Sequence, residues 1–75
     1  MRVLVVGGSG LLGTELVRQC VDRGDDVIGT SMHSRPSGMG VKWHQLDVRI
    51  KPEVEELLAS IRPAIVINTA YRQSD

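Results

Sequence analysis

Residues 2–13 read RVLVVGGSGLLG, and this stretch decides the fold. Its first part, residues 2–6, is a short apolar run rich in β-branched side chains, which is typical of a parallel strand covered on both faces. The run stops at a group of glycines. Apolar side chains then recur at the spacing of an amphipathic helix, at Leu11, Leu12, Leu16, Val17, Cys20 and Val21. The stretch therefore predicts a strand, a tight turn and a helix in direct succession.

The glycines of this turn have the spacing Gly-x-x-Gly-x-x-Gly. Gly7 lets the chain turn sharply off the strand, Gly10 leaves room for a pyrophosphate, and Gly13 lets the helix pack closely on the sheet. Unpaired N–H groups and the positive dipole end favour an anion at the helix N-terminus, where the Ser9 hydroxyl could add a contact. A tight connection without a ligand is the alternative, whereas a P-loop is excluded because no Gly-Lys-Ser/Thr follows. We expect the pyrophosphate of a dinucleotide at this turn.

The chain after the first helix alternates between turn residues and short apolar runs. The helix is expected to end near Arg23, because Gly24 is typical of the position after a helix. Residues 25–26 predict a turn and residues 27–30 a second strand. Residues 31–40, rich in Ser, Pro and Gly, predict a loop.

The last part of the chain adds two strands and one helix. Residues 41–46 are a weaker strand candidate, and residues 64–68 are another apolar run of the buried parallel type. Between them, Pro52 suits a first helical turn and the pair at 62–63, Arg-Pro, closes the helix. Its apolar positions are Val54, Leu57, Leu58 and Ile61. The order βαββαβ predicts an α/β fold, the N-terminal half of a Rossmann-type doubly wound parallel sheet with strand order 3-2-1-4. Its fourth strand is expected to expose an edge and apolar faces, which predicts marginal stability or aggregation.

Cofactor choice in such folds is set at the end of the second strand. An acidic side chain there binds the adenosine ribose of NAD and repels the extra phosphate of NADP. This chain has Thr30 and Ser31 instead. Ser31, His33, Ser34 and Arg35 could hold a 2′-phosphate by charge-assisted hydrogen bonds, although solvated loop residues are the alternative. We expect NADP(H) to be preferred, with NAD(H) also possible.

Two further segments lie at the carboxyl ends of predicted strands. The Asp47 carboxylate could reach the adenine amino group while Val48 packs on the ring, but Asp is equally a turn or capping residue there. After the fourth strand, Ala70 is small enough for the cofactor to pass and Tyr71 could line that passage, with a plain turn as the alternative. Trp43 is expected to cover the sheet without contacting a cofactor.

The composition excludes several classes of partner. Nine basic residues balance nine acidic ones, so nothing indicates nucleic acid or an anionic membrane. The longest apolar run, residues 64–67, is far too short for a membrane helix, and no secretory signal precedes the first strand. We expect a cytoplasmic protein in which Cys20, the only cysteine, is a buried structural thiol.

Three segments, VGGSGLLG at 6–13, LDV at 46–48 and RPAIVINTA at 62–70, resemble the extended short-chain dehydrogenase/reductase superfamily. The subgroup most similar is the dTDP-4-dehydrorhamnose reductase family, from which Ala64 and the segment 69–73 depart. This resemblance implies NAD(P)H-dependent reduction of a 4-keto deoxysugar nucleotide. It implies the pyrophosphate at Gly10, Leu11 and Leu12, the ribose at Ser31, the adenine at Asp47 and Val48, and the nicotinamide side near Ala70 and Tyr71.

The chain contains no Tyr-x-x-x-Lys, the pair that transfers a proton in this superfamily. The resemblance therefore implies that residues 1–75 are only the N-terminal portion of an NAD(P)-binding domain, without catalytic residues, and that the sugar nucleotide binds elsewhere in a longer enzyme. The regulatory β subunit of methionine adenosyltransferase is similar too, which keeps a non-catalytic NADP(H)-binding module open. An NAD-dependent nucleotide-sugar epimerase or dehydratase is the third alternative.

Overall fold

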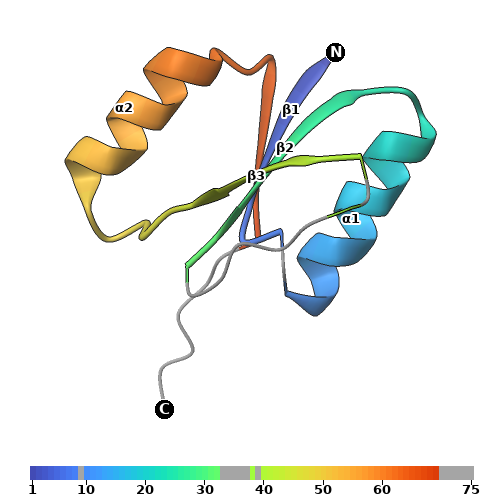
Figure 1. Ribbon diagram of the computed structural model, residues 1–75, viewed down its shortest axis with the longest axis horizontal. Coiled ribbons are helices and arrows are strands. Elements are labelled where there is room, and N and C mark those ends of the chain that lie inside the picture. Colours follow the sequence, from blue (N-terminus) through green and yellow to red (C-terminus); the bar gives the residue numbers. More distant parts are fainter. Residues whose placement is uncertain (9, 33–37, 39, 70–75) are drawn as a thin grey trace.

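A computed structural model describes residues 1–8, 10–32, 38 and 40–69, and within them a parallel sheet lies between two helices (Figure 1). The elements are β1 (Arg2–Val6), α1 (Leu11–Asp22), β2 (Asp26–Ser31), β3 (Lys42–Gln45), α2 (Lys51–Ile61) and β4 (Ile65–Asn68). The strand order is β3-β2-β1-β4, with every neighbouring pair parallel. The Rossmann-type topology and the order 3-2-1-4 predicted from the sequence are confirmed.

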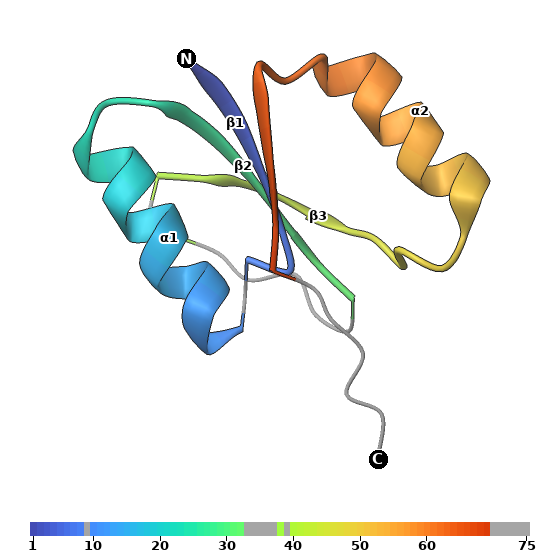
Figure 2. The same ribbon diagram turned by 180° about the vertical axis from the view of Figure 1, so that it is seen from behind.

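The core has two layers because the two helices cover opposite faces of the sheet (Figures 1 and 2). On one face, side chains from β1 and β2 pack against α1, and this cluster holds Val3, Val5, Val17, Cys20 and Val27. On the other face Leu4, Val6 and Ile28 pack against Ile61 of α2. The central strand β1 is thus buried on both faces, which explains its continuous apolar run. The thiol of Cys20 is buried, as expected.

The end of α1 follows from Gly24, whose φ of 88° favours glycine. The Gly24 N–H donates to the Val21 carbonyl at 2.9 Å and the Asp25 N–H to the Cys20 carbonyl at 3.0 Å, so two terminal carbonyls are paired. The Arg23 guanidinium lies 2.7 Å from the Asp25 carboxylate. Its hydrogen bond holds the pKa of Asp25 below the ordinary value.

The second strand is longer than the sequence predicts. Asp26, expected in a turn, pairs with Arg2, and Ser31, expected in a loop, pairs with Gln45. Sheet pairing uses backbone groups, so a neighbouring strand can extend the ladder through polar residues that break the apolar pattern. In contrast, β3 and β4 are shorter than the expected ranges 41–46 and 64–68.

The outer strand β4 leaves apolar side chains uncovered, as the sequence predicts. Ile65 is 39 % exposed and Val66 49 %. In the part of the chain described here, neither helix has the length and apolar character needed to cross a membrane.

Candidate functional site

The glycine turn connects the carboxyl end of β1 to α1. Gly7 has φ 80°, a backbone conformation that glycine adopts readily and other residues rarely do. Its carbonyl accepts a hydrogen bond from the Gly10 N–H at 3.1 Å. A Cβ atom at Gly13 would overlap the Gly7 carbonyl oxygen and lie 2.8 Å from the Gly8 Cα. The structure therefore shows the sharp turn at Gly7 and the close helix packing at Gly13 that the spacing predicts.

Three threonines hold this turn: Thr14 in α1, Thr30 in β2 and Thr69 directly after β4. The Gly7 N–H donates to the Thr30 hydroxyl at 3.2 Å, and the Gly8 N–H donates to the Thr30 carbonyl at 2.9 Å. The Thr14 hydroxyl donates to the Gly8 carbonyl at 3.2 Å, and the Thr69 hydroxyl donates to the Gly7 carbonyl at 3.0 Å. Every backbone polar group of Gly7 and Gly8 is thus paired. No sequence pattern indicates a role for these hydroxyls, because each bonds to a residue outside its own helix or strand.

The N-terminus of α1 is open toward an anion. Gly10 is the N-cap residue, with φ −72° and ψ 174°, and the first turn contains no acidic side chain. The N–H groups of Leu11, Leu12 and Gly13 cannot be paired within the helix. Leu11 is 95 % exposed and Leu12 61 %. A Cβ at Gly10 would meet only the Gly7 carbonyl oxygen, at 3.6 Å, so the space beside this residue is free.

The other predicted site residues within the description lie at the same edge of the sheet. Ser31 ends β2 and is buried, and its carbonyl accepts from the Leu46 N–H at 2.9 Å. The Asp47 carboxylate accepts the Arg49 N–H at 3.0 Å and lies 2.9 Å from the Arg49 guanidinium. This hydrogen bond raises the pKa of Arg49. The structure shows the turn role of Asp47, while its adenine contact and that of the exposed Val48 stay predictions. Ser9, His33, Ser34, Arg35, Ala70 and Tyr71 lie outside the described residues.

Trp43 supports the turn from behind, a contact that sequence analysis did not predict. It pairs with Gly29 in the sheet, and its Cζ3 atom lies 2.5 Å from where a Cβ on Gly29 would be. The same ring atom lies 3.1 Å from the Cβ position of Gly8. The ring also packs against the core on the α1 face. An isolated glycine inside an apolar strand signals such a close approach, and Gly29 carries that signal.

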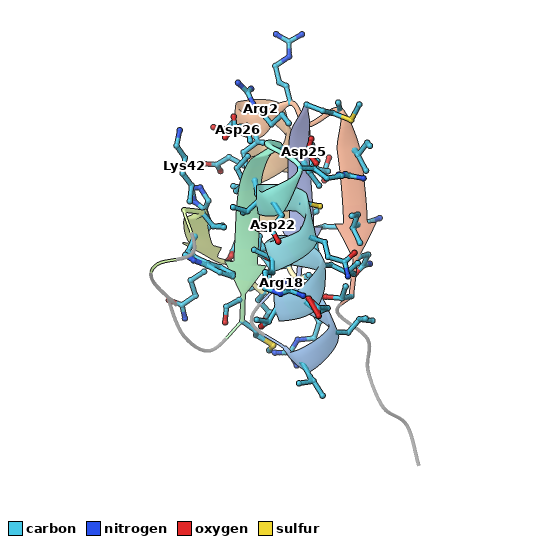
Figure 3. All side chains as sticks on the ribbon, turned by 90° about the vertical axis from the view of Figure 1, so that its right-hand side faces the viewer. Arg2, Arg18, Asp22, Asp25, Asp26 and Lys42 are labelled. Atoms are coloured by element: carbon cyan, nitrogen blue, oxygen red, sulfur yellow. The ribbon has the colours of Figure 1, made fainter. Side chains whose placement is uncertain are left out.

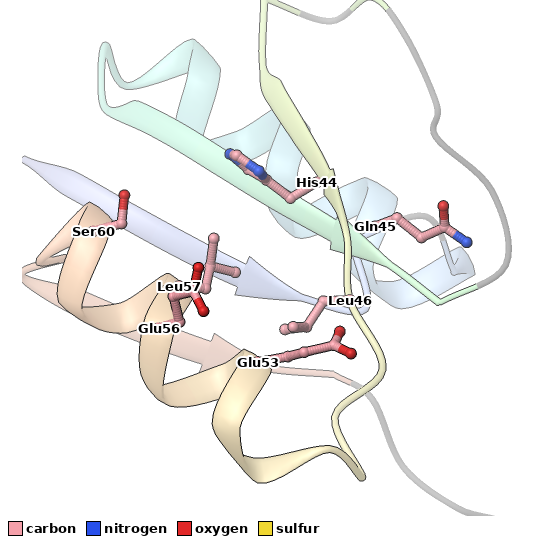
Figure 4. Close-up of a pocket in the computed structure, with 7 residues that line it drawn as sticks. All are labelled: His44, Gln45, Leu46, Glu53, Glu56, Leu57 and Ser60. Carbon is pink, nitrogen blue, oxygen red and sulfur yellow. The ribbon is translucent and has the colours of Figure 1, made fainter.

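Two other parts of the described surface carry acidic side chains. The amino ends of β1, β2 and β3 carry the mixed charges of Arg2, Asp26 and Lys42 (Figure 3). A hollow of about 250 Å³ lies between β3 and α2, with carboxylates of Glu53 and Glu56 among its lining groups (Figure 4). Its remaining lining residues are His44, Gln45, Leu46, Leu57 and Ser60. Two carboxylates would repel a pyrophosphate in this hollow.

Comparison with known proteins agrees with this geometry. Residues 3–75 match the family described as NAD dependent epimerase/dehydratase. A curated protein of Haloferax volcanii, "Probable low-salt glycan biosynthesis reductase Agl14", is 37 % identical over 70 residues, which cover 93 % of this chain and 23 % of that protein. The chain thus spans about a quarter of that relative's length.

Two solved structures show the same fold at useful sequence identity. The UDP-glucose 4-epimerase of Thermus thermophilus, solved with NAD, superimposes with a TM-score of 0.85 at 32 % identity and covers 99 % of this chain and 25 % of its own. A short-chain dehydrogenase of Leptospira borgpetersenii with bound NAD⁺ gives 0.83 at 30 % identity, over 97 % of this chain and 32 % of its own. The chain belongs to the NAD-dependent epimerase/dehydratase family.

Proposed function

We propose that residues 1–75 form the N-terminal, dinucleotide-binding portion of an NAD(P)H-dependent reductase that acts on a 4-keto deoxysugar nucleotide. The observation that carries the proposal is the glycine turn, in which the backbone groups of Gly7 and Gly8 are paired while the first turn of α1, whose N–H groups have no partner within the helix, contains no acidic residue. The Haloferax relative, described as a reductase of glycan biosynthesis, supports reduction. The Thermus neighbour, a UDP-glucose epimerase, supports a nucleotide-linked sugar as substrate.

Each described part of the site has a separate task in this proposal. The N–H groups of Leu11, Leu12 and Gly13, with the helix dipole, hold the pyrophosphate. Gly10 leaves the space for it. Val48 packs on the adenine ring and Asp47 accepts from its amino group. When bound, the dinucleotide supplies the hydride, and the sugar nucleotide binds to another part of the longer protein. The chain has no Tyr-x-x-x-Lys, so we assign it binding and no proton transfer.

We further propose that NADP(H) is preferred to NAD(H). Ser31 ends β2 without a carboxylate, so nothing at that position repels a 2′-phosphate. The positive charge of Arg35, with the donors His33 and Ser34, is suited to hold it. The neighbours solved with NAD argue for the other cofactor, so the preference has to be measured directly.

A titration of the full chain with NADPH and with NADH tests both statements. Trp43 is the only tryptophan and contacts the glycine turn, so we expect energy transfer from its ring to a bound reduced nicotinamide. Amide NMR should show shifts at residues 7–13 with both ligands, and tighter binding of NADPH. Reduced nicotinamide mononucleotide, which lacks the adenylate half and its pyrophosphate link, is the control. A folded chain that responds to neither dinucleotide at millimolar concentration contradicts the proposal.

An NAD-dependent nucleotide-sugar epimerase or dehydratase is the second candidate, and the family match favours it. Such an enzyme recycles its cofactor, so NAD retained by the longer protein through gel filtration would support this candidate over a reductase. A protein that binds NADPH yet oxidises none of it with any 4-keto sugar nucleotide would instead indicate the non-catalytic regulatory module.

A further inference from the structure

Thr69, the residue directly after β4, is bonded to the last residue of β1 and to the first residue of the glycine turn. Its hydroxyl shares one proton between two acceptors, the Val6 carbonyl at 2.7 Å and the Gly7 carbonyl at 3.0 Å. Its backbone N–H also donates to the Val6 carbonyl, at 2.8 Å. The hydroxyl therefore connects the end of one strand to a turn that lies 62 residues earlier in the chain.

The Gly7 carbonyl is the atom on which the shape of the turn depends. It accepts hydrogen bonds from the Gly10 N–H and from the Thr69 hydroxyl, and the Gly13 Cα packs against it. The N–H of the same residue is held by the Thr30 hydroxyl. A glycine with φ near 80° has wide conformational freedom, so bonds at both of its backbone groups are what restrict it.

The hydroxyl also matters for charge. The Gly7 carbonyl oxygen lies beside Gly10, the N-cap of the helix that offers N–H groups to the pyrophosphate. A carbonyl oxygen carries a partial negative charge, which opposes an anion nearby. A proton donated to this oxygen offsets part of that charge and fixes the direction of the C=O bond.

We propose that Thr69 is a positioning residue for dinucleotide binding: its hydroxyl holds the Gly7 carbonyl, and with it the turn, in the conformation that presents the α1 N–H groups to the pyrophosphate. This inference rests on the proposed function, since it assumes that a dinucleotide binds at the turn. The turn is proposed to bind the pyrophosphate, which NADPH and NADH share, so loss of the Thr69 hydroxyl should weaken the binding of both dinucleotides equally.

Removal of the hydroxyl affects affinity more than folding. In Thr69→Val, the Val6 carbonyl keeps the backbone N–H of residue 69 and the Gly7 carbonyl keeps the Gly10 N–H, so neither acceptor is left unpaired. The β-branched shape is also kept. Without the hydroxyl the turn of the free protein is less restricted. Part of the binding free energy is then used to order the turn, and the affinity falls.

The test compares Thr69→Val and Thr69→Ser with the parent chain. We expect the Kd for NADPH to rise about tenfold in Thr69→Val, the worth of one hydrogen bond, and to return close to the parent value in Thr69→Ser. The amide resonance of Gly10 should shift in the valine variant alone. Ile67→Val is the matched control, because it removes a methyl group of β4 that packs on the core, and it should lower stability without changing Kd.

The outcomes separate the two proposals. If the parent chain binds NADPH and Thr69→Val binds it equally well, the role of Thr69 is refuted and the proposed function stands. A valine variant that is unfolded in urea-free buffer, or a serine variant that fails to restore affinity, also refutes the positioning role. If the folded parent chain binds neither dinucleotide, the proposed function itself fails.

Discussion

Replacing Gly10 by Asp should stabilise the fold and abolish cofactor binding at the same time. Gly10 occupies the N-cap of α1 with extended backbone angles, and a Cβ there meets only one atom within 4 Å, at 3.6 Å. An Asp at an N-cap accepts a hydrogen bond from the first helical turn and interacts favourably with the helix dipole. These two effects together amount to about 0.5–1 kcal/mol, which corresponds to a rise in Tm of about 5 °C for a chain of this length.

The same carboxylate would stand where the pyrophosphate is proposed to bind. Two unit charges about 4 Å apart at an effective dielectric constant of about 20 repel by about 4 kcal/mol. After allowance for screening by salt, the Kd for NADPH should rise by at least about 100-fold. Thermal melting by circular dichroism gives the first quantity, and the Trp43 energy-transfer titration gives the second.

Gly10→Asn is the matched control, because it has nearly the size and capping ability of Asp without the charge. We expect it to raise Tm by the capping contribution alone, less than Asp, and to weaken binding much less than Asp. If Gly10→Asp binds NADPH like the parent chain, the pyrophosphate does not lie at the α1 N-terminus. If it melts at a lower temperature, the N-cap role of Gly10 is wrong.

Three further predictions concern packing and charge. Gly13→Ala should destabilise the fold by about 1–3 kcal/mol in urea unfolding, because the new methyl group overlaps the Gly7 carbonyl; an unchanged midpoint would contradict the close packing. Gly29→Ala should lower the free energy of unfolding by a similar amount, because its Cβ would lie 2.5 Å from the Trp43 ring. This loss should be smaller in a Trp43→Leu background, and additive effects of the two substitutions would argue against the contact. The pKa of Asp25 is lowered from its ordinary 3.8 in the folded state, so the stability that its carboxylate contributes is present above pH 4 and is lost as the pH falls further. Asp25→Asn should therefore make Tm fall less steeply between pH 5 and 2. An equally steep fall would show that other carboxylates cause the loss of stability in acid.

The sequence predicts those features of the fold that follow from local patterns. A run of apolar residues specifies β1, and the helical spacing with Gly24 specifies α1 and its end. The observed strand order is one that right-handed crossovers allow for βαββαβ, with the two helices on opposite faces. The ends of β2 could not be predicted, because Asp26 and Ser31 join the sheet through backbone bonds to other strands, which no property of their side chains indicates.

In the candidate site, too, local patterns predict one part and contacts between distant residues determine the other. The spacing of the glycines indicates the turn, since glycine is required there by backbone geometry alone. The hydroxyls of Thr30 and Thr69 and the ring of Trp43 support that turn through contacts across the sheet, and a threonine at the end of a strand has many unrelated uses.

The supporting groups bear on how the described turn would bind the proposed anion through backbone groups. Because the threonine hydroxyls and backbone groups satisfy every polar atom of Gly7 and Gly8, these residues have no unpaired group that competes for the ligand. The N–H groups at the start of α1 are left to face outward. Under the proposed function, such a site would bind the pyrophosphate that NAD(H) and NADP(H) share and would not distinguish the two cofactors. The proposal assigns discrimination to the end of β2 and the residues that follow Ser31, so substitutions at the glycine turn should change the affinity for both cofactors without changing the preference between them.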